Sequence, residues 1–181
     1  AHLGLAFIIY GYLLWIALDL LFPTSHLTSP TQPRWLRSWS FMITALVFIT
    51  ALAGGLVAGL RAGFVYNTFP LMGGHWIPDE ILGLSPLWRN FFEDIPTVQF
   101  DHRLLATLLC ILIPLFWWKA KAVALPVHTR WALHGLLVML VIQVILGIST
   151  LLLYVPVSLA ASHQAGALAL FTVALWVNHQ Y

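Results

Sequence analysis

The sequence predicts an all-α, polytopic membrane protein with five transmembrane helices. Hydrophobic residues make up 61% of the 181 residues and charged residues only 8%, whereas a soluble domain carries about 25% charged residues. The chain therefore could not cover a water-facing surface. Nine tryptophans suit a protein that is anchored at two membrane interfaces. The net charge of +2, without a long run of Lys or Arg, argues against a nucleic-acid partner.

Five apolar segments carry this prediction, and each has about the 20 residues that a spanning helix requires. They cover approximately residues 3–22, 39–60, 98–118, 131–154 and 158–177. A polar stretch through residue 38 follows the first segment, and a tight turn around Pro156 joins the last two. Residues 61–96 form a loop too long for a simple connector. We expect this loop to pack over one end of the helices, with a short interfacial helix near residues 87–92.

Basic residues predict the orientation of the chain in the membrane. Arg34 and Arg37 precede the second segment, and Lys119, Lys121 and Arg130 lie between the third and the fourth. With five spans, these two connections fall on the same side, which the positive-inside rule makes the cytoplasmic or matrix side. The 61–96 loop carries two arginines and four acids, so we expect it on the outside.

The chain begins Ala1-His2-Leu3, without a methionine and already apolar. No basic region precedes this segment, so it does not resemble a signal peptide. We expect further helices upstream that this sequence does not contain. The single cysteine, Cys110, excludes an internal disulfide and a multi-cysteine metal site, and we interpret it as a small buried hydrophobic residue.

Three of the eight histidines occupy equivalent places. His2, His102 and His163 lie near the starts of the first, third and fifth segments. These segments run from outside to inside, so we expect the three imidazoles at similar depth near the outer interface. A tryptophan follows each histidine, about 20 Å deeper on a helix. These tryptophans are Trp15, Trp117 and Trp176.

Two histidines at equal depth on neighbouring parallel helices suit the ligation of a flat haem from both faces. An ionisable side chain inside a membrane is costly and usually functional. Zinc would require four ligands, and only Asp101 lies at the same depth. The sequence therefore favours His102 and His163 as ligands of a haem iron. The alternative is that each histidine forms a hydrogen bond between helices.

The neighbouring charges and the other histidines have simpler interpretations. Arg103 could pair with a haem propionate through two hydrogen bonds, or face water at a helix end. Asp101 could also be a helix-start residue, favourable near the positive end of the helix dipole. We interpret His134, which has no matched partner, as structural. The remaining histidines are predicted to be solvated, and they are His26, His75, His128 and His179.

Four stretches of the sequence resemble the haem A synthase family. They are Ala-Gly-Leu-Arg-Ala-Gly-Phe-Val-Tyr-Asn-Thr-Phe-Pro-Leu-Met-Gly-Gly-His-Trp-Ile-Pro at 58–78, Gln-Phe-Asp-His-Arg at 99–103, Leu-Gly-Ile-Ser-Thr-Leu-Leu-Leu-Tyr-Val-Pro at 146–156 and Ser-His-Gln-Ala at 162–165. The pattern is most similar to the mitochondrial and alphaproteobacterial branch, which lacks the paired loop cysteines of other branches.

The resemblance implies eight transmembrane helices in two four-helix halves, of which this chain holds the last five. Residues 1–38 would be the last helix of a truncated N-terminal half, which holds the substrate haem, and the connecting loop. Residues 39–181 would be the C-terminal four-helix haem b domain, with His102 and His163 as iron ligands. His2 would be one of two ligands of the substrate haem. Its partner histidine and a catalytic glutamate would lie upstream.

The family's enzymes oxidise the C8 methyl group of haem O to a formyl group, giving haem A for terminal oxidases. Because half of the substrate site would lie upstream, we expect this chain alone to be inactive. The resemblance implies a multi-pass protein of the bacterial inner membrane or the mitochondrial inner membrane. Its partners would be haem, the lipid bilayer, an electron donor, and haem O synthase or oxidase assembly factors. A homo-oligomer stays open.

Two other functions stay open from the residues alone. The first is a membrane b-type cytochrome that carries electrons and has no catalytic site. The second is a transporter with a histidine proton relay, although the segments are not broken and carry no acid near mid-membrane. The 61–96 loop could shield the haem edge or the substrate entry, or be anchored at the interface by Trp76 and Trp88. The candidate lid residues are Asn67, Phe69, Pro70 and Trp76.

Overall fold

The computed structural model describes residues 2–22 and 33–181, and the regular structure in these ranges is helical. Five of the helices are long and apolar enough to cross a membrane. They are α1 (His2–Leu21), α2 (Arg34–Gly59), α4 (Ile95–Ala120), α5 (Val127–Leu152) and α6 (Val157–His179). The predicted polytopic membrane protein with five spans is therefore confirmed.

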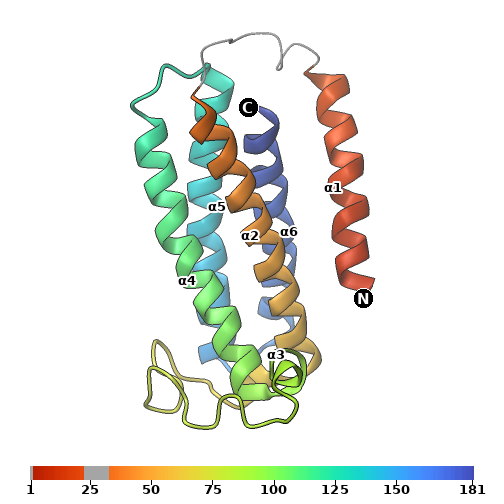
Figure 1. The fold of residues 1–181 in the computed structure, drawn as a ribbon, viewed down its shortest axis with the longest axis vertical. Coiled ribbons are helices and arrows are strands. Elements are labelled where there is room, and N and C mark those ends of the chain that lie inside the picture. Colours follow the sequence, from red (N-terminus) through yellow and green to blue (C-terminus); the bar gives the residue numbers. More distant parts are fainter. Residues whose placement is uncertain (1, 23–32) are drawn as a thin grey trace.

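Four of the long helices lie side by side, and α1 stands apart from them (Figure 1). Helix α2 packs against α4 and α6, and α5 packs against the same two helices. Helices α4 and α6 run antiparallel to α2 and α5. Short connections join α4 to α5 and α5 to α6, whereas residues 60–94 join α2 to α4. Helix α1 contacts mainly α6, with a smaller contact to α2.

The second and fourth helices begin earlier than predicted. Arg34 and Arg37 lie in the first two turns of α2, so the prediction of a loop through residue 38 is wrong there. Pro33 has φ −59° and ψ 130° and immediately precedes this helix. Pro126 stands in the same place before α5, and a proline stops the backbone before it from being helical. Polar side chains do not prevent a helix from extending beyond the hydrocarbon layer.

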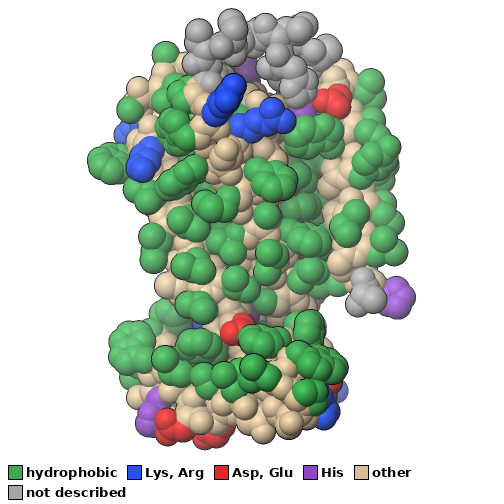
Figure 2. Space-filling view, viewed as in Figure 1, with side chains coloured by type: hydrophobic (Ala, Val, Ile, Leu, Met, Phe, Trp, Pro, Cys, Tyr) green, Lys and Arg blue, Asp and Glu red, His purple; other side chains and the backbone are tan. Residues whose placement is uncertain are grey.

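Lys and Arg side chains lie at both ends of the molecule (Figure 2). We call the end at which α2 and α5 begin and α4 ends the inner end, and five of the eight basic residues lie there: Arg34, Arg37, Lys119, Lys121 and Arg130. Lys119 and Lys121 lie there over the rings of Trp39 and Trp117, at 5.0 and 4.5 Å from the ring centres. The first of these cation–π contacts joins the inner ends of α2 and α4, and the second lies within the end of α4.

The prediction that His179 is solvated is wrong. Its side chain is fully buried at the end of α6, where Nε2 lies 2.8 Å from the Asp19 carboxylate of α1. Trp15 packs edge-on against the same imidazole at 5.1 Å. This contact joins the inner end of α1 to α6. His75 and His128 are exposed as predicted, and His26 lies outside the described residues.

The opposite, outer end is covered by residues 60–94. This segment contains the 3-10 helices η1 (Ala62–Phe64) and η2 (Leu87–Arg89) and the short helix α3 (Asn90–Glu93). The interfacial helix predicted near residues 87–92 is therefore present, as η2 followed by α3. Leu87, Trp88 and Phe92 are exposed on it, as expected of apolar side chains that meet the membrane interface.

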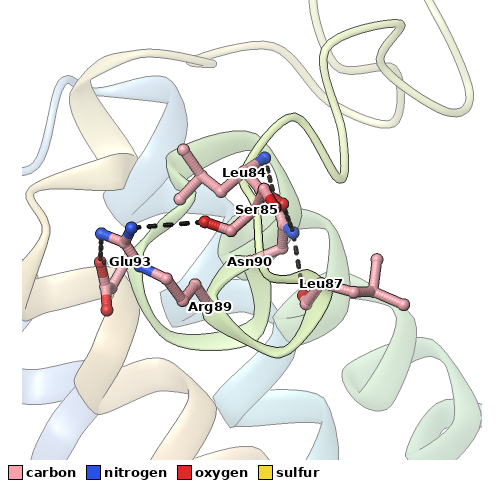
Figure 3. Close-up of polar contacts among 6 residues, drawn as sticks. All are labelled: Leu84, Ser85, Leu87, Arg89, Asn90 and Glu93. Carbon is pink, nitrogen blue, oxygen red and sulfur yellow. Dashed lines mark hydrogen bonds and ion pairs between the residues drawn. The ribbon is translucent and has the colours of Figure 1, made fainter.

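Asn90 holds this part of the outer segment together (Figure 3). Its side chain is fully buried. The amide nitrogen donates to the carbonyls of Leu84 and Leu87, at 2.8 and 2.9 Å, and the amide oxygen accepts from the Leu84 N–H at 2.8 Å. One side chain thus replaces three backbone partners that a strand or helix would otherwise supply.

Replacement of Asn90 by alanine is expected to loosen residues 82–93. The change leaves the Leu84 N–H and carbonyl without their partner, at a cost of about 2–3 kcal/mol. Amide hydrogen exchange of residues 84–90 should accelerate by roughly 30- to 150-fold. The matched control is Glu93→Gln, which removes the exposed ion pair with Arg89 and should leave exchange nearly unchanged. Equal exchange in the two variants would contradict the role of Asn90.

Candidate functional site

His102 on α4 and His163 on α6 face each other near the outer end of the four packed helices. Their ring centres are 6.5 Å apart, and the ring planes are inclined at 86°. A metal–imidazole bond is about 2 Å long and the ring centre lies about 1 Å beyond the nitrogen, so two imidazoles on one metal ion have ring centres roughly 6 Å apart. The observed spacing is therefore close to that of two ligands on opposite sides of one metal ion.

The hydrogen bond of His102 fixes which of its nitrogens is free. Nδ1 lies 3.2 Å from the backbone carbonyl of Thr50 on α2. A carbonyl only accepts, so Nδ1 must carry the proton, and Nε2 keeps its lone pair. Metal-binding histidines commonly donate their other N–H to a carbonyl in this way. The His163 Nδ1 is buried and has no hydrogen-bond partner among the described residues.

A glycine lies behind each of the two imidazoles. A Cβ atom on Gly54 of α2 would stand 3.1 Å from the His102 Cε1, and one on Gly147 of α5 would stand 2.9 Å from the His163 Cε1. Both rings therefore lie close to the backbone of the neighbouring helix, with the Cε1 atom nearest to it. The arrangement is repeated, because α2 supports α4 in the same way that α5 supports α6. Neither glycine was a candidate site residue from the sequence.

The two histidines lie in a layer of the helices in which every described residue keeps part of its surface exposed. The layer consists of residues 48–61 of α2 and its end, 100–108 of α4, 141–153 of α5 and its end, and 157–165 of α6. On its inner side the helices are tightly packed around Ile43, Ile113, Phe116 and Leu136, each at most 1% exposed. We call the layer formed by residues 48–61, 100–108, 141–153 and 157–165 the open layer.

The outer segment closes the other side of the open layer. Gln99 on α4 is 2% exposed and donates to the carbonyl of Tyr66 at 3.0 Å. Asn67 donates to the carbonyl of Leu151 at the end of α5, at 3.2 Å. Of the proposed lid residues, Asn67 thus joins the segment to a second helix, whereas Phe69 and Trp76 are exposed.

Arg103 is held by the outer segment in this structure. Its guanidinium donates to the carbonyls of Tyr66 and Thr68 at 2.9 Å each, and to those of Pro70 and Leu71 at 3.4 Å each. Sequence reasoning offered a haem propionate or water as its partner and missed this role. The signal was present in the spacing, because Arg103 follows Gln99 by four residues and the two side chains share one helix face.

The structure does not bring the remaining candidate histidines to the His102–His163 pair. His2 begins α1 and is exposed. His134 donates from Nδ1 to the Arg130 carbonyl of its own helix at 2.6 Å and packs edge-on against Trp117, which agrees with its structural interpretation. Within the described ranges no three His, Cys, Asp or Glu side chains lie close enough to hold a metal ion.

The environment of Tyr66 adds a polar contact at the outer surface. Its hydroxyl donates to Glu80 at 3.1 Å. Burial of the ring, together with this hydrogen bond and the negative charges of Glu80 and Asp94, raises the pKa of Tyr66 above its ordinary value. The hydroxyl therefore keeps its proton at neutral pH and remains a donor to the carboxylate.

Comparison with known proteins places this geometry in context. The family model for COX15-CtaA, described as cytochrome oxidase assembly protein, matches residues 1–175. A heme A synthase of Nitrosospira multiformis is 59% identical over 99% of this chain and 51% of its own length. Heme A synthase COX15 of Homo sapiens is 47% identical over 99% of this chain and 44% of its own. A heme A synthase of Paramagnetospirillum magneticum is 44% identical over 99% of this chain and 50% of its own length.

The chain spans about half the length of the curated relatives that it matches. The relatives include proteins of the mitochondrial and alphaproteobacterial branches, as the sequence motifs predicted. No solved structure gives a significant match.

Proposed function

Because the chain belongs to the COX15-CtaA family of cytochrome oxidase assembly proteins, we propose that it is the C-terminal part of a haem A synthase that holds a haem b between His102 and His163. Helices α2 to α6 would form the haem b domain, whose predicted start at residue 39 lies inside α2, and α1 would belong to the half that holds the substrate haem. The activity is inferred from relatives named heme A synthase. The whole enzyme would oxidise a methyl group of haem O to the formyl group of haem A.

The observation that carries the haem b proposal is the His102–His163 pair within the open layer. The ring separation of 6.5 Å suits one metal ion between the imidazoles, and the Thr50 carbonyl leaves the Nε2 of His102 free to bind it. A zinc site is disfavoured, because the pair has no further ligand among the described side chains.

Each residue of the site would have a defined task. His102 and His163 would bind the iron, the Thr50 carbonyl would orient the first imidazole, and Gly54 and Gly147 would let both rings lie close to the backbone. A haem held by these two histidines would supply one-electron transfer. The apolar helices around it would exclude water and tune its potential.

The substrate haem would lie against α1, away from the His102–His163 pair. His2 would supply one of its ligands, and the partner would come from helices outside this sequence. The proposal therefore assigns haem b binding, and not the complete reaction, to these residues. The chain would act in the bacterial inner membrane or the mitochondrial inner membrane, next to its electron donor.

Titration of the purified chain with haem tests this function. The chain should give a six-coordinate, low-spin b-type spectrum, and His102→Ala and His163→Ala should each abolish it and weaken haem binding by more than about tenfold. His134→Ala is the matched control, since this histidine bonds to its own helix, and it should keep the full spectrum. A low-spin spectrum that survives both site variants would refute the proposal.

A further inference from the structure

A groove lies between α1 and the adjacent faces of α2 and α6, on the inner half of the molecule. It has a volume of about 780 Å³. It is separate from the His102–His163 pair, and none of its lining residues belongs to the haem site except Phe48, at the edge of the open layer. We propose that this groove binds one anionic phospholipid of the inner leaflet, with its headgroup at Arg37 and its acyl chains along α2 and α6.

The length of the groove matches one leaflet of a bilayer. On α2 the lining runs from Arg37 to Phe48, which is about 16 Å along a helix. Half of the hydrocarbon core of a bilayer is about 15 Å thick. The groove therefore begins at the inner interface and ends near mid-membrane, which is the course of an acyl chain and not that of a peptide helix crossing the membrane.

The polarity of the groove changes along its length as it does along a phospholipid. The deep end is formed by Phe7, Phe48 and Phe171, whose ring centres lie 5.3 to 6.3 Å apart. Thr44, in the middle of the groove, is polar, but its hydroxyl already donates to the carbonyls of Ser40 and Ala174. The apolar part thus offers contacts and no unsatisfied polar group to an acyl chain.

The inner mouth of the groove offers hydrogen-bond donors. Arg37, Ser38, Asn178 and Tyr181 line it. Arg37 is exposed, and none of the described residues forms an ion pair with it. The Tyr181 hydroxyl is buried and has no hydrogen-bond partner among the described residues. No acidic side chain lines the described part of the groove, so the mouth is complementary to a phosphate group.

The volume of the groove agrees with a lipid that has two chains. A cavity of about 150 Å³ accommodates the six carbons of benzene, so 780 Å³ has room for roughly thirty carbon atoms. This is the size of two acyl chains.

Native mass spectrometry of the purified chain tests the proposal. The chain is reconstituted in nanodiscs of phosphatidylcholine and phosphatidylglycerol and released into detergent, and the retained lipids are counted. We expect one phosphatidylglycerol per chain, retained in preference to phosphatidylcholine. Arg37→Gln should lower this retention about fivefold, the effect of one cationic side chain at an anionic headgroup. Arg34→Gln changes a neighbouring exposed arginine outside the groove and should change retention by less than about twofold.

A second variant tests the apolar part independently of charge. Ala45 lines the middle of the groove, and Ala45→Phe should fill it and displace phosphatidylglycerol and phosphatidylcholine alike, with circular dichroism confirming that the helices persist. The proposal is overturned if no lipid is retained, or if Arg37→Gln retains as much phosphatidylglycerol as the unchanged chain. It is also overturned if Arg34→Gln causes the same loss, or if a correctly folded Ala45→Phe variant keeps its lipid.

Discussion

Replacement of Gly147 by leucine is expected to abolish low-spin haem binding while leaving both proposed ligands in the chain. A Cβ atom at this position would stand 2.9 Å from the His163 Cε1, a distance that forces the imidazole to move. A displaced ring would no longer face His102 at the observed ring separation of 6.5 Å. A ligand displaced by even a fraction of an ångström would bind weakly, because metal–imidazole distances are confined to about 2 Å.

The haem titration used for the histidine variants measures this effect. The expected spectrum of Gly147→Leu is five-coordinate, with His102 as the remaining ligand. Gly59→Leu is the control, because a Cβ atom on Gly59 meets nothing within 4 Å, and this variant should keep the six-coordinate spectrum. Gly54→Ala should lie between the two, since its Cβ would stand 3.1 Å from His102 and the ring could give by a few tenths of an ångström. A normal spectrum from Gly147→Leu would show that His163 does not lie against this backbone.

The positions of the spans and of both histidines could be predicted from the sequence, for a physical reason. A membrane imposes a length and a polarity on each helix that can be read from composition. The matched depth of His102 and His163 followed from the start positions and directions of their helices. The beginnings of α2 and α5 could not be predicted in this way, because their first turns carry polar residues and are set by Pro33 and Pro126.

The contacts around the histidines were beyond sequence reasoning. Which residue lies behind an imidazole depends on how neighbouring helices are rotated about their axes, and apolar residues surround these helices on every side. The Thr50 carbonyl is a backbone group, so the residue type at this position does not indicate its contact with His102. His179 was misjudged because it follows the last apolar segment, where only the packing of α1 reveals its burial against Asp19.

Replacement of Arg103 by alanine is expected to release the outer segment from α4. The guanidinium donates two hydrogen bonds of 2.9 Å and two of 3.4 Å to carbonyls of residues 66–71. A hydrogen bond to a charged group contributes about 1.5–3 kcal/mol, and partial exposure of the side chain lowers the total to roughly 3 kcal/mol. Opening of residues 66–71 should therefore become about 100-fold more frequent. Limited proteolysis and amide exchange of this stretch measure it.

Arg103→Lys separates this role from that of a charge beside a haem propionate. Lysine keeps the positive charge, but its single ammonium cannot reach four carbonyls that are arranged around a planar guanidinium. If Arg103 acts as a clamp on the outer segment, Arg103→Lys should open residues 66–71 nearly as much as Arg103→Ala does. If Arg103 serves mainly as a charge for the propionate, Arg103→Lys should keep the haem affinity of the unchanged chain and Arg103→Ala should lower it. Residues 66–71 should then be equally protected in the two variants. Protection by lysine equal to that by arginine would therefore exclude the clamp, because only the fork of the guanidinium matches the carbonyls of Tyr66 and Thr68 at once.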